Sequence, residues 1–584
     1  MKNFRAAFED LWYLSRPYFT SEEKKSAWVL LTAVLGLTLL LVGADVLQSF
    51  SRNIFYTALQ QRDVTSFLRG LFWFVRTPSM IIPGFFIITL PSLLISVYAT
   101  YLQQLLQLRW RRWMTHRMLA QWLDQNLAFR IAVTQAHLKE TSDNPDQRIQ
   151  EDIDGFVRDT LSQFLDIVSR TITFVSYVGL LWALSGSITV LGVRIPGYFL
   201  WIALLYSAFA SIVTHLTGRR LIPLRIAQQK AEADFRYGLV HVRDHADSIA
   251  LSDGGDREKH LLLGKFSTVY DNFLGIMTRT KWLGFLTDGL GTLSGNFALL
   301  VGSIRYFAGK ITFGTLMQLV QAFSRIEEAL GWIWSAYPAI TEWRANVSRL
   351  ASFQRTMDLA SANNHDNPHE RSVTDSDIVT KNLTMLRPDG SVLLSNVNIT
   401  LPQGHDIVLT GASGVGKSIL LRAIAGIWPF TRGQVHMPEA RMMFISQRPY
   451  LPIGTLSEAI CYPHAPGTIS DEMICSTLMQ VGLSSLLSER DLETKWTARL
   501  SPGEQQRLMF GRILLNKPEW VFLDESTSNL DVTSEAALYD LLHEKLPDLS
   551  IVSVTHRVSL QDRHTMRIDL SGFTNAARTE MIMT

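Results

Sequence analysis

The chain has 584 residues, which is too long for one domain, and this length suggests three or four structural units. Charged residues make up 18% of the sequence and hydrophobic residues 47%. A soluble domain carries about 25% charged residues, so part of the chain is expected to lie in lipid. The net charge of +2 gives no indication of a nucleic-acid partner, and Cys461 and Cys475 have neither metal-site spacing nor a disulfide framework.

The first 25 residues mix charged and aromatic side chains. They contain no apolar run followed by a small-residue cleavage site, which excludes a removable signal peptide. Residues 1–25 are therefore predicted to form an amphipathic helix at the membrane surface.

Residues 26–357 carry the apolar stretches of a membrane domain. Four of these stretches are uncharged and long enough to cross a bilayer: 26–44, 77–108, 171–193 and 195–218. Two more are interrupted by charges, 282–301 by Asp288 and 311–340 by Arg325, Glu327 and Glu328. We therefore predict about six transmembrane helices.

Basic residues predict the orientation of these helices. The two long segments 109–160 and 219–281 are rich in Arg and Lys, so the positive-inside rule places them in the cytosol. An even number of spans then leaves both chain ends in the cytosol. The loop 51–76 also carries arginines and follows the rule less well.

Asp45, Asp288, Glu327 and Glu328 lie in or beside apolar stretches. An ionisable group at membrane depth usually faces a cavity or a partner and is often functional. For Asp45 and Asp288, a misplaced span boundary is an equal alternative. Apolar sequence flanks Glu327 and Glu328 on both sides, which favours a cavity or a proton-linked role.

Residues 358–376 are polar and show no periodicity, which predicts a linker. From Asp377 the pattern changes to short strand-like runs, 378–386 and 392–401, around a Pro388-Asp389-Gly390 turn. A second domain over 377–584 is therefore predicted.

A phosphate-binding loop follows the predicted strand 406–410. It fits the pattern of a glycine, four residues and Gly-Lys-Ser, and a helix is predicted directly after it. The residues concerned are Gly411, Ala412, Ser413, Gly414, Val415, Gly416, Lys417, Ser418 and Ile419. Backbone N–H groups and the helix start would point at a phosphate, Lys417 would reach the β- and γ-phosphates, and Ser418 would hold Mg²⁺.

Polar residues follow three further predicted strands. Gln447 comes after 441–445, Asp524 and Glu525 after 519–523, and His556 after 550–554. In an open α/β sheet, ligands bind at these carboxyl ends of the strands. Asp524 is expected to hold the Mg²⁺ shell, and Glu525 to orient or deprotonate the attacking water.

These motifs resemble those of the ABC ATPases over residues 377–570. The stretch 500–507, Leu-Ser-Pro-Gly-Glu-Gln-Gln-Arg, is similar to that family's signature, with Pro502 and Glu504 where Gly and Gln are usual. The resemblance implies that Ser501, Gly503 and Glu504 grip the nucleotide of a facing domain. It also implies that Gln447 touches the metal and γ-phosphate and that His556 is the switch histidine. The residues Ser528-Asn529-Leu530-Asp531 match the family's D-loop, which ends at Asp531.

An aromatic residue that stacks on adenine is usual in this family, and here the equivalent position falls at about Arg387. A guanidinium plane can stack on a base. Alternatively, Arg387 points to solvent and Leu386 or Pro388 packs against the ring.

The stretches 143–149, 447–456 and 500–507 look like the bacterial YddA and SbmA/BacA-like branch of ABC half-transporters, related to the peroxisomal subfamily D. The resemblance implies an α-helical, type IV exporter-like membrane domain of six transmembrane helices and an α/β P-loop ATPase domain. It implies a homodimer in a bacterial inner membrane, with ATP and Mg²⁺ bound in the cytosol. Residues 144–149 and 232–236 are candidates for contacts with the ATPase domain, or alternatively solvated helix faces.

The cargo is not selected by any motif. Relatives move fatty acyl-CoA, peptide antibiotics or cobalamin. We expect an ATP-driven transporter of hydrophilic or amphipathic cargo, such as peptides or cobalamin-like compounds. The alternatives are an exporter of acyl-CoA or lipid-type cargo and a membrane-tethered ATPase that regulates a partner complex.

Overall fold

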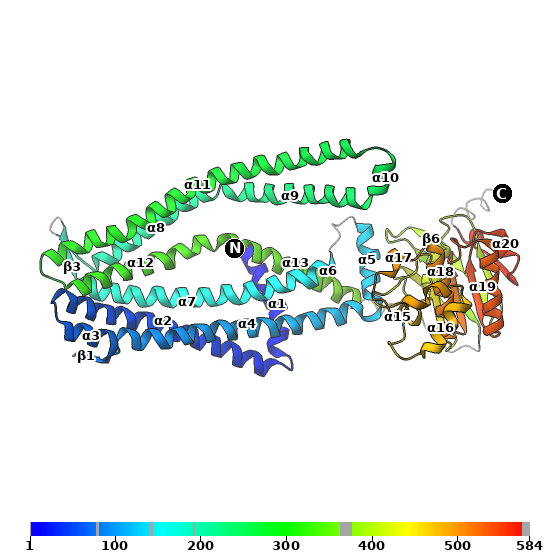
Figure 1. Ribbon diagram of the computed structural model, residues 1–584, viewed down its shortest axis with the longest axis horizontal. Coiled ribbons are helices and arrows are strands. Elements are labelled where there is room, and N and C mark those ends of the chain that lie inside the picture. The colour runs from blue at the N-terminus through cyan, green and yellow to red at the C-terminus, as the bar shows by residue number, and fades with distance from the viewer. Residues whose placement is uncertain (1, 78–80, 139–143, 191–192, 363–375, 575–584) are drawn as a thin grey trace. The chain divides into compact units, whose positions relative to one another are not determined.

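The computed structural model describes residues 2–77, 81–138, 144–190, 193–362 and 376–574 (Figure 1). The chain divides into two compact units. The helical unit comprises Met1–Met118 and Pro145–Ser352, and the α/β unit comprises Leu119–Asn144 and Phe353–Thr584. The segment Leu119–Asn144, which lies within the predicted membrane domain, therefore belongs to the same compact unit as the second domain.

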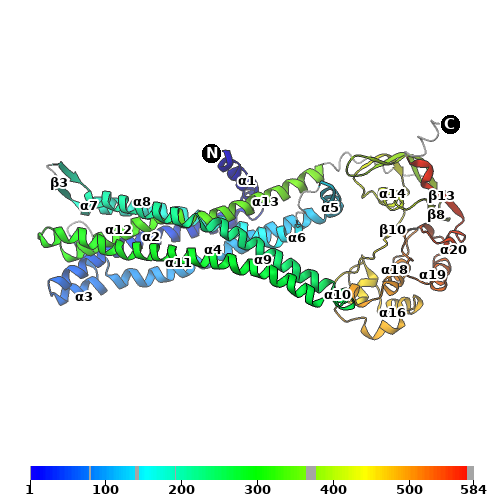
Figure 2. The same cartoon turned by 90° about the horizontal axis from the view of Figure 1, so that it is seen from above.

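Long helices that run side by side build the helical unit (Figures 1 and 2). The helices are α1 (Lys2–Thr20), α2 (Lys24–Gln60), α3 (Val64–Phe72), α4 (Phe85–Leu123), α6 (Pro145–Gln147), α7 (Ile153–Ser185), α8 (Tyr198–Gly218), α9 (Leu221–Asp244), α10 (Ala246–Leu251), α11 (Gly255–Phe307), α12 (Phe313–Ser335) and α13 (Tyr337–Ala362). A π-helical turn, Arg148–Asp152, joins α6 to α7. Both views show α9 and α11 side by side, joined by α10.

Four helical stretches among the described residues are long and apolar enough to cross a membrane. They are Lys24–Gln60, Phe85–Leu123, Pro145–Ser185 and Tyr198–Asp244, and they contain most of the first four predicted spans. The stretches 282–301 and 311–340 are helical as well, in α11, α12 and the start of α13. Their charged and polar residues make them less apolar than the other four.

Two short hairpins lie partly within stretches that were predicted to be transmembrane helix, 77–108 and 171–193. The strands β1 (Val75–Arg76) and β2 (Ile81–Ile82) precede α4, and β3 (Ser187–Val190) pairs with β4 (Val193–Pro196) between α7 and α8. The predicted span 171–193 is therefore wrong at its end, because α7 stops at Ser185. Gly197 begins α8 with φ +65°, and a side chain at this position would collide with the Trp182 ring.

The predicted linker begins too early. α13 continues to Ala362, and the amides of Gln121 and Gln354 donate to Asp358 Oδ1 at 2.8 and 2.9 Å. These contacts keep the polar start of the predicted linker in a helix. The remainder of that stretch, 363–375, lies outside the described residues.

A five-stranded parallel sheet forms the centre of the α/β unit, in the order β10-β11-β12-β8-β13. Its strands are β8 (Asp406–Thr410), β10 (Met442–Ile445), β11 (Trp520–Asp524), β12 (Ser550–Val554) and β13 (Met566–Asp569). The runs in β8, β11 and β12 are nearly all buried, as is typical of parallel strands covered on both faces. The strand predictions at 406–410, 519–523 and 550–554 are confirmed to within one residue.

A second, antiparallel sheet has the order β6-β5-β7, with β9 also paired to β5. It consists of β5 (Ile378–Leu386), β6 (Val392–Val397), β7 (Thr400–Leu401) and β9 (Thr431–His436), and β5 and β6 form the predicted hairpin. The helices of this unit are α5 (Leu127–Leu138), α14 (Lys417–Ile424), α15 (Leu456–Cys461), α16 (Asp471–Gln480), α17 (Trp496–Arg499), α18 (Pro502–Asn516), α19 (Val532–Lys545) and α20 (Val558–Gln561).

Candidate nucleotide site

The phosphate loop connects β8 to α14. Gly411, Gly414 and Gly416 have φ of +143°, +78° and +114°, which favour glycine. At Gly416 a Cβ would also lie 2.9 Å from a Leu393 methyl group, so glycine is needed there for space as well. The loop therefore has the curled backbone that a phosphate cradle requires.

Lys417 lies over this loop. Its Nζ donates to the carbonyl oxygens of Gly411 at 2.9 Å and Ala412 at 3.1 Å, and the residue is only 6% exposed. Burial lowers the pKa of Lys417, and the nearby Glu525 and Asp524 carboxylates oppose this shift. A buried ammonium whose partners are carbonyls is suited to bind an anion.

Ser418 and Asp524 form a pair suited to a hard cation. Ser418 Oγ donates to Asp524 Oδ1 at 2.8 Å, across 106 residues of sequence. Burial raises the pKa of Asp524, while the Ser418 hydrogen bond and the Arg422 charge lower it. Mg²⁺ prefers oxygen ligands and usually takes one or two carboxylates together with substrate phosphates, so this pair fits it.

Residues that follow three neighbouring strands meet at the carboxylate of Glu525. Its Oε2 accepts a hydrogen bond from Gln447 Nε2 at 2.9 Å, and its Oε1 lies 3.3 Å from His556 Nε2. Glu525 has φ +48°, which is uncommon for a residue with a side chain and is found often at functional sites. The predicted catalytic residues Glu525, Gln447 and His556 thus lie together, and Gln447 contacts Glu525 rather than the Ser418–Asp524 pair.

The signature stretch forms the start of α18. Ser501 is the N-cap residue, Pro502 occupies the first turn, and Glu504 completes a capping box with Ser501. Asp531 caps α19 by accepting from Ser534 N at 2.8 Å. Hydrogen bonding to the Ser534 side chain, and after it to the Ser534 backbone, lowers the pKa of Asp531. The side chain of Gln506 accepts from Asn529 N at 2.9 Å, so the signature helix is bonded to the D-loop.

Three other predicted nucleotide contacts have distinct surroundings. The side chain of Val415 is buried and its N–H donates to the Ala412 carbonyl oxygen at 3.2 Å, while the side chain of Ile419 packs against the core. Arg387 is exposed in the turn between β5 and β6, where Nη1 donates to Ser391 Oγ at 3.3 Å. The stacking role of Arg387 stays a prediction.

The helix α5, which the sequence prediction missed as a contact segment, packs on the α/β core. Phe129 and Val133 lie against the core cluster around β8 and α14, and Arg422 Cζ lies 5.8 Å from the centre of the Phe129 ring. The signal in the sequence was the apolar run Leu-Ala-Phe-Arg-Ile-Ala-Val inside a charged segment. Arg422 belongs to α14, so α5 touches the helix that also carries Lys417 and Ser418. The charge of Arg422 also lowers the pKa of Asp524.

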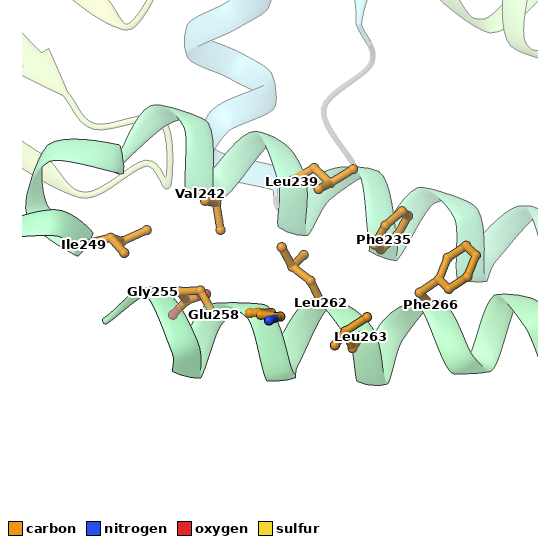
Figure 3. A pocket seen from close by; sticks show the side chains of 10 residues that line it. Phe235, Leu239, Val242, Ile249, Gly255, Glu258, Leu262, Leu263 and Phe266 are labelled. Carbon is orange, nitrogen blue, oxygen red and sulfur yellow. The ribbon is translucent and has the colours of Figure 1, made fainter. Parts of the chain in front are cut away.

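Apart from Asn144, the two stretches that were predicted to contact the ATPase domain lie in the helical unit. Arg148 and Arg349 both pair with the buried Asp152, at 2.6 and 3.0 Å. Phe235 points toward Phe266 across the α9–α11 pair, with ring centres 5.5 Å apart, and both rings line a pocket whose walls are mostly apolar side chains (Figure 3). A role for 144–149 and 232–236 at the ATPase domain stays a prediction.

The acidic residues of the apolar stretches differ in their partners. Asp45 accepts from Arg325 Nη2 at 2.9 Å and from the Tyr177 hydroxyl at 2.8 Å, so it lies inside the bundle and not at a helix end. Arg325 Nη1 also donates to Glu328 at 2.9 Å. Glu327 accepts a hydrogen bond from Ser294 of α11, whereas Asp288 is exposed on the same helix.

The phosphate loop, the Ser418–Asp524 pair, the Glu525 cluster and the signature helix together define an ATP-binding cassette. Long apolar helices in the same chain make it an ABC transporter that carries its own membrane domain. Two family models match the chain, "ABC transporter transmembrane region 2" over residues 14–307 and "ABC transporter" over residues 394–528. The chain belongs to the ABC transporter family.

Similar proteins extend over nearly the whole chain. An ABC transporter ATP-binding protein of Haemophilus influenzae is 33% identical, covering 96% of this chain and 92% of its own. The inner membrane ABC transporter ATP-binding protein YddA of Escherichia coli is 31% identical, with 93% and 94% covered. The human lysosomal cobalamin transporter ABCD4 is 25% identical, with 74% and 76% covered.

A solved structure has the same fold. A bacterial Atm1-family ABC exporter with ATP bound superposes with a TM-score of 0.69 at 14% identity, covering 93% of this chain and 94% of the other. The predicted fold class, an α-helical membrane domain with an α/β ATPase domain, is confirmed. The chain is a membrane protein with a nucleotide-binding ATPase domain, as predicted.

Proposed function

We propose that two copies of this chain form a homodimeric transporter in a bacterial inner membrane, with both ATPase domains in the cytosol. Each ATP site would be completed by Gly503 and Ser501 of the second copy, whose Ser501 N–H and hydroxyl would donate to the γ-phosphate. The proposed cargo is hydrophilic or amphipathic, such as a peptide or a cobalamin-like compound. The name of the E. coli relative supports the proposed inner-membrane location, and the name of the human relative supports a cobalamin-like cargo.

The convergence of Gln447 and His556 on Glu525 is the observation that carries the proposed hydrolysis. A carboxylate held by two side chains can orient a water molecule and accept its proton. Lys417 and the phosphate-loop amides would neutralise the phosphates, and Ser418 and Asp524 would hold Mg²⁺, which supplies further charge neutralisation when it is bound. Phosphoryl transfer depends mainly on such positioning and charge neutralisation.

Replacement of Glu525 by Gln tests this assignment. In full-length protein in nanodiscs, Glu525→Gln should lower kcat for ATP hydrolysis by at least about 100-fold, because the base is lost while its shape is kept. ATP should still bring the two ATPase domains together, as measured by distance between spin labels. Glu519→Gln, at the opposite end of the same strand region, is the matched control and should hydrolyse ATP normally. Unchanged turnover in Glu525→Gln would remove Glu525 from the mechanism.

The cargo requires a separate measurement. Uptake and efflux of peptides, cobalamin and acyl-CoA should be compared in vesicles of fixed orientation, with Glu525→Gln as the inactive control. ATP-dependent movement of acyl-CoA alone would favour the lipid-type alternative. ATP hydrolysis with no movement of any cargo would favour a membrane-tethered ATPase that acts on a partner complex.

A further inference from the structure

Glu504 occupies both hydrogen-bond donors of the signature serine. Its Oε2 accepts from Ser501 N–H and from Ser501 Oγ–H, each at 2.8 Å, and the Glu504 N–H donates back to Ser501 Oγ at 3.3 Å. The carboxylate lies at the start of the fifteen-residue helix α18, where the helix dipole stabilises negative charge. One carboxylate oxygen therefore accepts hydrogen bonds from both the backbone N–H and the hydroxyl of Ser501.

These two donors are those that the proposed function assigns to the γ-phosphate bound by the second copy. A phosphate oxygen and a carboxylate oxygen are both anionic acceptors, so they compete for the same N–H and O–H groups. They also repel each other when they lie side by side. The resting bonds of Glu504 must therefore break before Ser501 can bind a phosphate.

We propose that Glu504, instead of gripping the nucleotide as the resemblance implies, is a positioning residue that acts as an internal competitor of ATP. Its carboxylate holds Ser501 in place of the phosphate in the resting chain, and it releases Ser501 when the second copy presents its nucleotide. This inference rests on the proposed function, because it requires Ser501 to face a nucleotide bound by another copy. Its consequence is that Glu504 raises the ATP concentration needed for closure and leaves the chemical step unchanged.

The chain contains a second capping box that serves as an internal reference. On α15, Glu458 Oε2 accepts from Thr455 N at 2.9 Å, and Glu458 N donates to Thr455 Oγ1 at 3.1 Å. The backbone pattern is the same as at Ser501, but Glu458 belongs to none of the motifs assigned to the nucleotide. If both glutamates only cap helices, Glu504→Gln and Glu458→Gln should have the same effect on the KM for ATP. If Glu504 competes with ATP, only Glu504→Gln should change that KM.

The test is the ATP dependence of hydrolysis by full-length protein in nanodiscs. Glu504→Gln keeps an oxygen acceptor for the cap and removes the charge, and it should lower the KM for ATP roughly fivefold, with kcat changed less than about twofold. Glu504→Asp keeps the charge and should retain the wild-type KM. Glu458→Gln should leave both constants as in the wild type.

The salt dependence of the KM for ATP distinguishes a charge effect of Glu504 from the loss of a helix cap. Because exposed charges are screened within about 10 Å at 0.1 M salt, the difference in KM between wild type and Glu504→Gln should shrink as salt is raised. Thermal unfolding of each variant shows whether the fold is kept. If Glu504→Gln does not fold, a lowered KM in the charge-retaining Glu504→Asp would by itself overturn the proposal.

The outcomes separate this inference from the proposed function. An unchanged KM in Glu504→Gln, or equal changes in Glu504→Gln and Glu458→Gln, would overturn the competitor role while wild-type hydrolysis still stands. A wild-type chain that does not hydrolyse ATP, or an active Glu525→Gln variant, would instead contradict the proposed function.

Discussion

Gln447 Nε2 donates a 2.9 Å hydrogen bond to Glu525 Oε2, joining the loop after β10 to the end of β11. His556, after β12, approaches the other oxygen of the same carboxylate at 3.3 Å. Glu525 itself has an uncommon backbone conformation, with φ +48°. The carboxylate is thus oriented by neighbours from both sides before any nucleotide is bound, which is how a catalytic group is kept in one productive position.

Replacing Gln447 by Ala should reduce ATP hydrolysis by roughly tenfold or more, because loss of a residue that orients a catalytic group costs about 10–100-fold. The KM for ATP should change less than kcat. Gln480→Ala, on the exposed end of α16, is the control and should behave as wild type. Wild-type kcat in Gln447→Ala would show that the bond to Glu525 has no part in turnover.

Asp524 makes stability depend on pH in a defined direction. Burial raises the pKa of its carboxyl, so the ionised form is less favourable in the folded chain than in the unfolded chain. Asp524→Asn should therefore raise the unfolding temperature of the nucleotide-free protein at pH 7, by roughly 1–3 °C. The gain should vanish as the pH falls through the raised pKa toward about 4, where both states bind the proton.

Asp531 provides the opposite control for that measurement. Its pKa is lowered by the hydrogen bond from Ser534, so its ionised form stabilises the fold above the ordinary Asp range and this contribution is lost in acid. Asp531→Asn should lower the unfolding temperature at pH 7. Shifts of the same sign in both variants would contradict the assigned environments.

The nucleotide site could be predicted from sequence because its parts are local. The phosphate loop, Asp524-Glu525 and His556 each follow a short apolar run, and such runs are typical of strands that are buried on both faces. What brings these parts within hydrogen-bond distance is the strand order β10-β11-β12-β8, which no local pattern specifies; the resemblance to a known family supplied only the roles of the residues.

The contacts of the helical segments could not be predicted in this way. Asp45 and Arg325 are 280 residues apart, and no local pattern pairs them. Strands β9 and β13 are short and only partly apolar, so they carry little signal of their own. The docking of α5 on the α/β core depends on Phe129 meeting Arg422, which only the tertiary fold determines.

The Phe129–Arg422 contact predicts a link between α5 and ATP hydrolysis. Phe129→Ala should remove the cation–π contact and part of the apolar packing of α5, and so weaken cargo stimulation of the ATPase several-fold while basal hydrolysis persists. The ratio of stimulated to basal activity measures this. Phe129→Tyr keeps the ring and should retain stimulation. Full stimulation in the Ala variant would separate α5 from coupling.

Gly314 lies where α12 packs closely against α2. A Cβ at Gly314 would overlap the Asn53 carbonyl oxygen and the Thr57 hydroxyl, and next to it Asn53 donates to Gln318 at 2.6 Å. Gly314→Ala should destabilise the helical unit by about 1–3 kcal/mol through overpacking. Gly331→Ala on the same helix has open space around its Cβ and should be tolerated. Equal unfolding temperatures for the two variants in detergent would contradict the close packing of α2 and α12.

Glu327 and Glu328 are adjacent but differ in their surroundings, which predicts different pH behaviour. Glu328 pairs with Arg325, whereas Glu327 accepts from the Ser294 hydroxyl and shows no ion pair among the described residues. A carboxylate inside a membrane bundle without a cation is costly to keep ionised, so Glu327 is the one expected to take up a proton. Titratable groups that lie near these two residues include Asp45, Tyr177, Tyr206 and Arg325.

Glu327→Gln keeps an acceptor for Ser294 and should flatten the pH dependence of cargo movement in vesicles, because the titrating group is gone. Glu328→Gln is the matched control and should keep the wild-type pH profile, since the Glu328 carboxylate is already paired with Arg325. ATP hydrolysis measured in parallel separates an effect on transport from one on the motor. The same pH profile in Glu327→Gln as in the wild type would rule out a proton-linked role for Glu327.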